Sequence, residues 1–458
     1  MSVDAAIAVF DRLEAGFIED LKTFLRFESI SAQNVHAPDM DACARWICGR
    51  LAAAGLDAHV LPTERHPVVL ADSGPANGAV PTLLFYGHYD VQPVGDPKLW
   101  QSPPFEPTLR DGALYARGSA DDKGQLMTHL AAVRCWRQTG SPWPVRLKFL
   151  IEGEEEIGSP SLPEVVRARA RELACNYVVL SDTAKLNADT PALAYASRGL
   201  VYKEITIEGP ARDLHSGQYG GAVANPANVL ARVLASLHDD AGRVTIPGFY
   251  EEVQPLSPGE RERLNRVGLS DADLLAATGC PAPAGEDGFS TAQRCTARPT
   301  LDINGLHGGY TGQGAATIIP AKAAAKVSMR LVADQNPDAV SHAFDRAVRT
   351  ACPPSVRVSI ADHTRCAAYL APVDSPGMKA AAAALAAAYG KPPVFTREGG
   401  TLPILPLFKE VLGADSLMLG FADPDCHLHG PNEFFRLSDF ARGTRCILRF
   451  LSEIANKA

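Results

Sequence analysis

The sequence contains no run of about 18 apolar residues, the length that a helix needs to cross a membrane. Positive charge is also scarce, because 44 Lys and Arg stand against 52 Asp and Glu, which gives a net charge of −8. Such a chain lacks the broad basic surface that binds nucleic-acid backbones. The ten cysteines are scattered among 458 residues without a CxxC pair. We therefore expect no membrane or nucleic-acid partner, and cysteines that stay reduced.

The first residues, Met1 to Asp4, show neither the positive start nor the apolar core of a signal peptide. Together with the isolated cysteines, this predicts a cytoplasmic location. With 46% hydrophobic and 21% charged residues, the composition is that of an ordinary globular protein. A chain of 458 residues is long enough for two or three domains.

Residues 1–196 alternate short apolar strands with helices. The strands are predicted at 82–86, 145–151 and 177–180, and the helices at 41–54, 124–137 and 163–174. Continuous apolar strands separated by helices are typical of a mainly parallel sheet with helices on both faces. The same pattern returns in residues 374–458. We therefore predict one α/β domain built from these two segments.

Residues 197–373 follow a different pattern. The strand predicted at 201–208 alternates apolar and polar residues, as a strand with one exposed face does. Helices are expected to start at the Asn-Pro pairs of residues 225 and 336. The order strand, helix, strand, strand, helix, strand predicts an inserted α+β domain with its helices on one face of a small sheet. Residues 242–299, rich in Pro, Gly and charge, are predicted to form a long surface excursion.

Five motifs rich in His, Asp and Glu stand near the ends of predicted strands. They contain His88 with Asp90, Asp121 with Asp122, the run Glu154 to Glu156, Asp182, and His427 with His429. Since ligands bind at the carboxyl ends of the strands in open α/β sheets, these side chains are expected to meet in one crevice. Imidazole and carboxylate ligands without a thiolate suit zinc, manganese or cobalt in a catalytic site.

Each motif has an ordinary explanation when it stands alone. A histidine at a strand end is usually structural, the run Glu154 to Glu156 is usually a solvated turn, and Asp121 can begin a helix. These explanations do not account for several such sets at successive strand ends of one sheet. Two imidazoles and three carboxylates can hold two divalent ions if one carboxylate bridges them. Asp90, two residues after His88, can accept the second ring N–H of that histidine.

Together the motifs resemble those of the two-metal metallopeptidase family of carnosinases, carboxypeptidase G, aminoacylase and succinyl-diaminopimelate desuccinylase. The resemblance covers essentially the whole chain and depends most on residues 86–91, 117–124 and 152–159. The chain length and the 242–299 excursion are most similar to the carnosinase-like dipeptidase branch. The resemblance implies two divalent metal ions, with zinc as the first candidate and manganese or cobalt as alternatives.

The resemblance also implies roles for single residues. The implied metal ligands are His88 and Asp182 on one ion, Glu156 and His429 on the other, and Asp121 on both, with a cis peptide bond between Asp121 and Asp122. Glu155 is implied as the general base. Asp90, from its position two residues after His88, is predicted as a further catalytic residue. The family pattern of a histidine followed four residues later by a glutamate selects His429 and Glu433 over His427.

In the inserted domain the resemblance implies contacts with substrate and with a second subunit. This lid/dimerisation domain would form a homodimer in which His215 reaches the partner subunit's active site and stabilises the oxyanion. Arg330 would bind the substrate carboxylate, because a planar guanidinium pairs with a carboxylate through two hydrogen bonds. Gly399, Gly400 and Thr401 would lie close to the same carboxylate.

The implied reaction is hydrolysis of an amide bond in a dipeptide or another small peptide with a free carboxylate, by a metal-bridged water with Glu155 as base. An amidohydrolase that removes N-acyl, N-succinyl or N-carbamoyl groups from amino acids shares this catalytic set, so it stays an alternative. A non-enzymatic protein on the same fold is a third alternative. It is expected to lose Glu155 or Asp121, and both are present.

Overall fold

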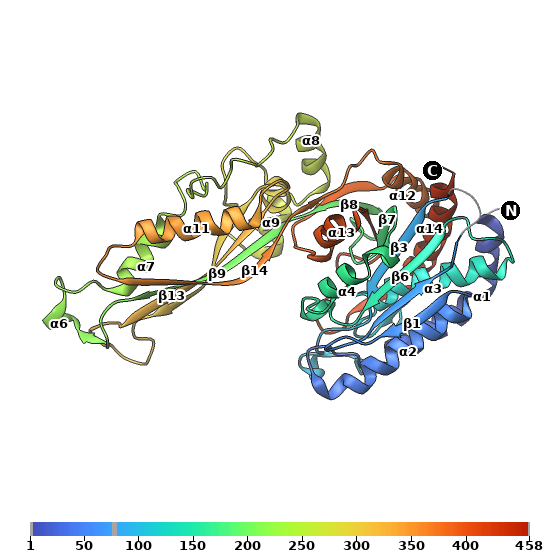
Figure 1. Ribbon diagram of the computed structural model, residues 1–458, viewed down its shortest axis with the longest axis horizontal. Coiled ribbons are helices and arrows are strands. Elements are labelled where there is room, and N and C mark those ends of the chain that lie inside the picture. The colour runs from blue at the N-terminus through green and yellow to red at the C-terminus, as the bar shows by residue number, and fades with distance from the viewer. Residues whose placement is uncertain (1–2, 76–79, 457–458) are drawn as a thin grey trace. The chain divides into compact units, whose positions relative to one another are not determined.

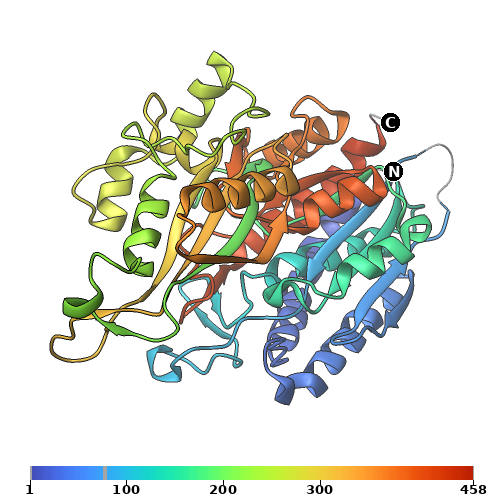
Figure 2. The same ribbon diagram turned by 60° about the vertical axis from the view of Figure 1, so that its left-hand side comes forward.

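The computed structural model describes residues 3–75 and 80–456 and divides the chain into two compact units (Figures 1 and 2). Unit 1 contains Met1–Tyr195, Ala371–Thr396 and Leu407–Ala458, and unit 2 contains Ala196–Leu370 and Arg397–Pro406. Met1 and Ser2, on which the signal-peptide argument partly rests, lie outside the described residues. Among the described residues, no helix combines the length and the apolar character that crossing a membrane requires.

The loop at 397–406 differs from the sequence-based division, which assigns it to the α/β domain. In the structure it groups with unit 2, where Arg198 and Arg330 form hydrogen bonds with it. The domain limits at 196 and 374 stay a prediction.

The largest sheet is mixed and has the strand order β1-β2-β6-β3-β7-β17-β8-β15, with β16 paired to β8. Its strands are β1 (Asp57–Leu61), β2 (Val68–Asp72), β3 (Thr82–His88), β6 (Arg146–Glu152), β7 (Tyr177–Leu180), β8 (Ala192–Ser197), β15 (Tyr369–Leu370), β16 (Val394–Glu398) and β17 (Asp415–Gly420). The four central strands β6, β3, β7 and β17 are parallel. The α/β class is confirmed, but the flanking pairs β1-β2, β2-β6, β17-β8 and β8-β15 are antiparallel. For β1-β2, the short connection 62–67 is the reason, because a parallel pair needs a longer crossover.

Helices cover both faces of this sheet (Figure 1). Phe85 and Tyr86 are neighbours on β3, so their side chains point to opposite faces. Phe85 packs against His129 of α3, with ring centroids 5.1 Å apart, and Tyr86 packs against Phe408 of α13 at 5.4 Å. The helices of this unit are α1 (Val3–Leu25), α2 (Ala37–Ala53), α3 (Lys123–Gln138), α4 (Leu162–Ala168), α5 (Ala170–Leu173), α12 (Pro376–Tyr389), α13 (Ile404–Leu412), which starts in unit 2, and α14 (Leu437–Ala455). A small sheet of β4 (Thr108–Arg110), β5 (Ala113–Tyr115) and β18 (Phe434–Arg436) completes the unit.

Unit 2 is built on an antiparallel sheet with the order β11-β13-β9-β14. Its main elements are β9 (Gly199–Glu208), α7 (Pro226–Ala235), β11 (Thr300–Gly308), β13 (Lys322–Leu331), α11 (Pro337–Ala351) and β14 (Arg357–Cys366). β9 and β13 alternate buried and half-buried residues, and their buried side chains pack with those of α7 and α11 in one core. Asn225 and Asn336 cap the two helices through their side chains. The predicted α+β order is therefore confirmed.

A buried carboxylate connects the two ends of the excursion at 242–299. It contains the helices α8 (Pro258–Val267), α9 (Asp271–Thr278) and α10 (Thr291–Thr296). Glu286 accepts two hydrogen bonds from Arg298, at 2.7 and 2.8 Å, and one from Arg243 at 3.2 Å. A short two-stranded sheet pairs β10 (Leu214–His215) with β12 (Ile318–Ile319), and α6 (Ser216–Tyr219) directly follows β10.

Burial of His129 predicts a pH-dependent stability. The pKa of His129 is lowered to about 3 because burial disfavours its charged form, whereas an unfolded histidine has a pKa of about 6.5. The unfolded state therefore takes up the proton first, and stability present above pH 6.5 is lost as the pH falls towards 3. Between pH 7 and pH 5, the titration of His129 should lower the free energy of unfolding by about 2 kcal/mol.

A His129→Gln variant should lose correspondingly less stability over the same pH range. Glutamine does not titrate, and it can still form a hydrogen bond with the hydroxyl of Ser181, which lies 2.7 Å from Nε2 of His129. Urea unfolding at pH 7 and pH 5 measures both losses. Equal losses in the two proteins would contradict the assignment to His129.

Candidate metal centre

Five side chains from separate segments of unit 1 converge beyond the carboxyl ends of the central strands. They are His88 at the end of β3, Asp121 just before α3, Glu156 in the short helix that follows β6, Asp182 after β7, and His429 in the loop after β17. The ligand atoms of His88, Asp121 and Asp182 lie within 4.8 Å of one another, and so do those of Asp121, Glu156 and His429. Asp121 therefore belongs to two adjacent groups of three ligands.

The two carboxylate oxygens of Asp121 face different histidines. Oδ1 lies 3.1 Å from Nε2 of His88, and Oδ2 lies 2.9 Å from Nε2 of His429. His88 also points towards Asp182, at 3.9 Å. Nε2 of His88 is buried and has no hydrogen-bond partner within the described part of the chain. Buried polar atoms are normally satisfied, so this nitrogen fits a metal ligand.

The carboxylates around this point are crowded and short of positive charge. Burial, together with the charge of Asp121, raises the pKa of Glu156 to about 7 and raises the pKa of Asp182 well above its usual value. Burial acts on Asp121 in the same direction, but the adjacent imidazoles of His429 and His88 hold its pKa well below the usual range. A divalent cation favours the charged form of every carboxylate beside it. The residues present therefore fit a site for divalent ions.

Asp90 fixes the orientation of His88. Nδ1 of His88 lies 3.1 Å from the main-chain oxygen of Asp90 and 3.3 Å from its carboxylate Oδ1. Since both neighbours are acceptors, Nδ1 carries the proton and Nε2 keeps its lone pair for a metal. The Asp90 carboxylate also accepts the main-chain N–H groups of Glu155 and Glu156, at 3.2 and 3.0 Å. One buried carboxylate thus positions a histidine and the acidic loop together.

Glu433 and Arg117 connect the two loops that carry Asp121 and His429. The buried Glu433 carboxylate accepts a hydrogen bond from Nη1 of Arg117 at 2.7 Å, and the N–H groups of Gly118, Ala120 and Asp121 at 2.8 to 3.1 Å. Nη2 of Arg117 donates to the main-chain oxygen of His429 at 3.1 Å. Glu433 entered the prediction only as the residue that selects His429, and no sequence pattern indicated a role for Arg117. The glutamate lies more than 300 residues after the arginine, so no local pattern connects them.

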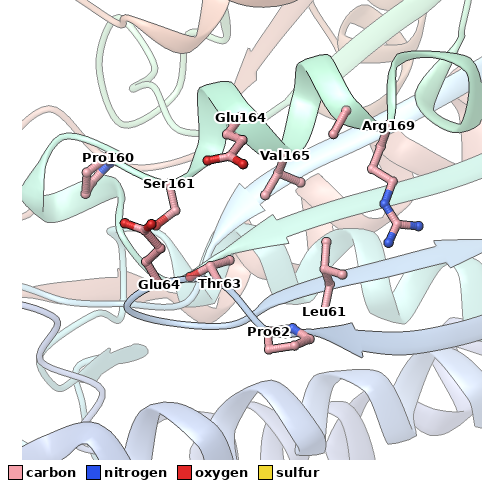
Figure 3. Close-up of a pocket in the computed structure, with 10 residues that line it drawn as sticks. Leu61, Pro62, Thr63, Glu64, Pro160, Ser161, Glu164, Val165 and Arg169 are labelled. Carbon is pink, nitrogen blue, oxygen red and sulfur yellow. The ribbon is translucent and has the colours of Figure 1, made fainter.

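Glu154, the first residue of the acidic run, has a structural role. Its carboxylate accepts the N–H groups of His66 and Ser161, both at 2.9 Å, and the hydroxyl of Thr63 at 3.1 Å. Thr63 and Ser161 also line the surface pocket drawn in Figure 3. None of the five converging side chains lines that pocket, which is therefore separate from the metal centre.

Glu155 and Glu156 have different surroundings from Glu154. Glu156 accepts a hydrogen bond from Nε2 of Gln92 at 2.8 Å, a contact that the sequence did not indicate. Burial raises the pKa of Glu155, against the effect of the His88 charge. The predicted cis peptide bond between Asp121 and Asp122 is confirmed.

The remaining predicted site residues belong to unit 2. Nη1 of Arg330 donates to Oγ1 of Thr401 at 2.6 Å, and the Gly399 oxygen accepts a hydrogen bond from Arg198. His215 is exposed, and its Nδ1 accepts the N–H of Gly217 at 3.0 Å. In unit 1, His427 is exposed and belongs to neither ligand group.

Replacing Asp121 should remove bound metal from both ligand groups, because one side chain supplies an oxygen to each. We expect purified wild-type protein, dialysed against zinc, to retain two ions per chain and to gain thermal stability. Asp121→Asn should retain fewer than one ion, whereas Glu410→Gln, at an exposed position, should match the wild type. Elemental analysis gives the metal content. Two tightly held ions in Asp121→Asn would contradict the shared ligand.

Comparison with known proteins identifies a metallopeptidase family and relatives that match most of this chain. The model of peptidase family M20/M25/M40 matches residues 84–453. A Cys-Gly metallodipeptidase of Candida albicans is 32% identical over 96% of this chain and 95% of its own, and one of Schizosaccharomyces pombe is 29% identical over 100% and 99%. The Beta-Ala-His dipeptidase of Homo sapiens is 29% identical over 96% and 90%.

Solved structures agree along nearly the whole chain. The M20 family metallo-carboxypeptidase Sso-CP2 from Sulfolobus solfataricus superimposes with a TM-score of 0.84 and 31% identity, covering 96% of this chain and 99% of its own. Human carnosine dipeptidase 1 gives a TM-score of 0.78 and 27% identity, with 99% of both chains covered. Because the family model spans most of the sequence and full-length relatives reach 30% identity, the chain belongs to peptidase family M20/M25/M40.

Proposed function

We propose that this protein is a metallodipeptidase that hydrolyses the amide bond of dipeptides, or of other small peptides with a free carboxylate. The observation that carries the proposal is the sharing of Asp121 between two adjacent groups of metal-binding side chains. Membership of the M20/M25/M40 family and full-length similarity to Cys-Gly and Beta-Ala-His dipeptidases support the reaction class. These relatives also make Cys-Gly and β-Ala-His the first substrates to test.

Two divalent ions, when bound, polarise the scissile carbonyl and lower the pKa of the attacking water. His88 and Asp182 would hold one ion, Glu156 and His429 the other, and Asp121 both. Zinc is our first candidate, because imidazole and carboxylate ligands suit it, and manganese or cobalt are alternatives. Asp90 accepts a hydrogen bond from Nδ1–H of His88, so Nε2 keeps its lone pair for a metal ion.

Glu155 is the proposed general base. It takes the proton from the attacking water on its carboxylate and then transfers that proton to the leaving amine. The hydrogen bond from its main-chain N–H to Asp90 fixes the backbone that carries this side chain.

Unit 2 has the proposed substrate-recognition and dimerisation role. Arg330, with Gly399, Gly400 and Thr401, binds the substrate carboxylate, and His215 stabilises the oxyanion in the partner subunit of a homodimer. The exposed position of His215 is compatible with a contact outside its own chain. Ile303 and Leu306 are exposed on the edge strand β11, which suits pairing with a second copy of unit 2. The cytoplasmic location stays a prediction.

Glu155→Gln should separate catalysis from metal binding. Without the base, kcat for Cys-Gly or β-Ala-His should fall by about 10²- to 10⁴-fold, while the five proposed ligands remain. Metal content and kcat are measured on the same preparation, with Glu410→Gln as control. Normal turnover by Glu155→Gln at full metal occupancy would contradict the role of this residue.

A substrate panel tests the proposed function directly. We expect the zinc-, manganese- or cobalt-loaded protein to cleave dipeptides at least tenfold more efficiently than N-acyl, N-succinyl or N-carbamoyl amino acids. Removing the metal with a chelator should abolish the activity, and one of the three ions should restore it. Preference for the acylated amino acids would move the assignment to the amidohydrolase alternative, and inactivity on both sets would refute the proposal.

A further inference from the structure

Two arginines of unit 2 contact the same short loop without a carboxylate partner. Nη1 of Arg330 donates to Oγ1 of Thr401 at 2.6 Å, and Nε of Arg198 donates to the Gly399 oxygen at 2.8 Å. Both side chains are half-buried. Across residues 3–75 and 80–456, neither arginine forms an ion pair, whereas the buried Arg117 and Arg298 each do. Arg198 and Arg330 are therefore partly desolvated cations without an ion-pair partner among the described residues, and Asp302 is the carboxylate whose charge acts on Arg198.

The backbone places both arginines beside this loop. Arg330 lies on β13 directly opposite Leu200 of β9, two residues after Arg198. The main-chain N–H of Arg198 also donates to the Gly400 oxygen at 3.0 Å, so two hydrogen bonds connect this residue to the loop. A Cβ atom at Gly399 would lie 2.8 Å from the Cys295 oxygen and 3.7 Å from Nη2 of Arg198. Glycine thus lets the loop pass between Cys295 and the guanidinium.

The guanidinium of Arg198 keeps N–H groups that form no hydrogen bond with the described residues. Its Nε is occupied by Gly399, but Nη1 and Nη2 have no hydrogen-bond partner among the residues that the structure describes. Arg198 also lines a cavity of about 430 Å³ in unit 2, together with Arg294, Arg298, Glu286 and Asp302, whereas Arg330 is not part of its lining. Arg298 is bound to Glu286, and Arg294 donates to two main-chain oxygens. Arg198 is the arginine of this cavity whose two terminal nitrogens are both free to bind a ligand.

The two positive charges also affect each other. Burial lowers the pKa of Arg198, and the charge of Arg330 lowers it further, while the charge of Asp302 acts in the opposite direction. Two neighbouring cations without an ion-pair partner are unfavourable in a partly buried place, and an anion that binds both relieves their repulsion. A carboxylate has two oxygens and can accept hydrogen bonds from both guanidinium groups.

We infer that Arg198 and Arg330 form a two-arginine carboxylate site, in which Arg198 binds the substrate through Nη1 and Nη2 while its Nε holds the Gly399 loop. The inference rests on the proposed function and extends it by assigning Arg198 as a second specificity-determining residue. It predicts that a peptide whose C-terminal carboxylate is replaced by an amide is a poor substrate.

Kinetics with a matched pair of peptides test this assignment. We expect wild-type protein to prefer Cys-Gly to Cys-Gly amide, and Arg198→Met to reduce this preference by about 10- to 100-fold, the effect of one charge-assisted hydrogen-bonding partner. The preference of Arg198→Lys should lie between those of the wild type and Arg198→Met, because lysine keeps the positive charge but lacks the paired N–H groups of a guanidinium. Arg357→Met, which removes an exposed charge from the same unit, is the control and should keep the wild-type preference.

The amide peptide distinguishes two roles of Arg198, binding of the substrate carboxylate and support of the Gly399 loop. If Arg198 only holds the loop, Arg198→Met slows the cleavage of both peptides equally and the preference stays unchanged, which would overturn the inference. If wild-type protein cleaves neither peptide, the proposed function fails, and a measurement without turnover decides the second question.

That measurement is protection from phenylglyoxal, a reagent that modifies arginine. We expect N-acetylglycine, but not N-acetylglycinamide, to slow the modification of Arg198 and Arg330 together, as followed by peptide mass spectrometry. Arg330→Met should weaken the protection of Arg198, because the two side chains bind one carboxylate. Labelling of Arg198 at the same rate with and without N-acetylglycine would overturn the two-arginine site.

Discussion

The two-sided contact of Asp121 is the constraint on which the rest of unit 1 depends. One carboxylate faces His88 through Oδ1 and His429 through Oδ2, so both halves of the site must meet at a single side chain. The two histidines lie more than 300 residues apart in the sequence, and the chain passes through all of unit 2 between them. Small errors in any of the loops would separate the ligand groups. The surrounding structure therefore has to fix these loops against one another.

Buried carboxylates that accept main-chain N–H groups provide this rigidity. Glu433 holds the Asp121 loop, Asp90 holds the start of the Glu155 helix, and Glu154 connects the same acidic loop to the connection between β1 and β2. A carboxylate that accepts several N–H groups defines a loop conformation more closely than apolar packing does, because each bond is directional. In this region, acidic residues are thus divided between holding the backbone and facing the ligand site.

The parts of the fold that could be predicted are those that depend on neighbouring residues in the sequence. The α/β alternation, the α+β insertion and the Asn-Pro caps at 225 and 336 follow from short-range periodicity and capping chemistry. The family resemblance located the motif residues that converge. The antiparallel flanking strands, the Arg117–Glu433 pair and the contact of Gln92 with Glu156 were missed. Each of these features depends on a partner distant in the sequence. Neither the spacing of residues nor their secondary-structure propensity indicates which distant residues will pair.

The balance of charge distinguishes the two functional regions from the rest of the protein. Some buried cations elsewhere have an internal anion: Lys185 pairs with Asp423 and Asp439, and Lys203 with Asp345 and Asp362. The buried Lys123 and Lys148 instead donate to main-chain oxygens. The centre around Asp121 has more carboxylates than cations, and the loop at Gly399 has two arginines without a carboxylate. Uncompensated charge in partly buried places costs stability, so it persists where hydrogen bonds or a ligand compensate it. We propose that divalent ions compensate the first region and that the carboxylate of a peptide compensates the second.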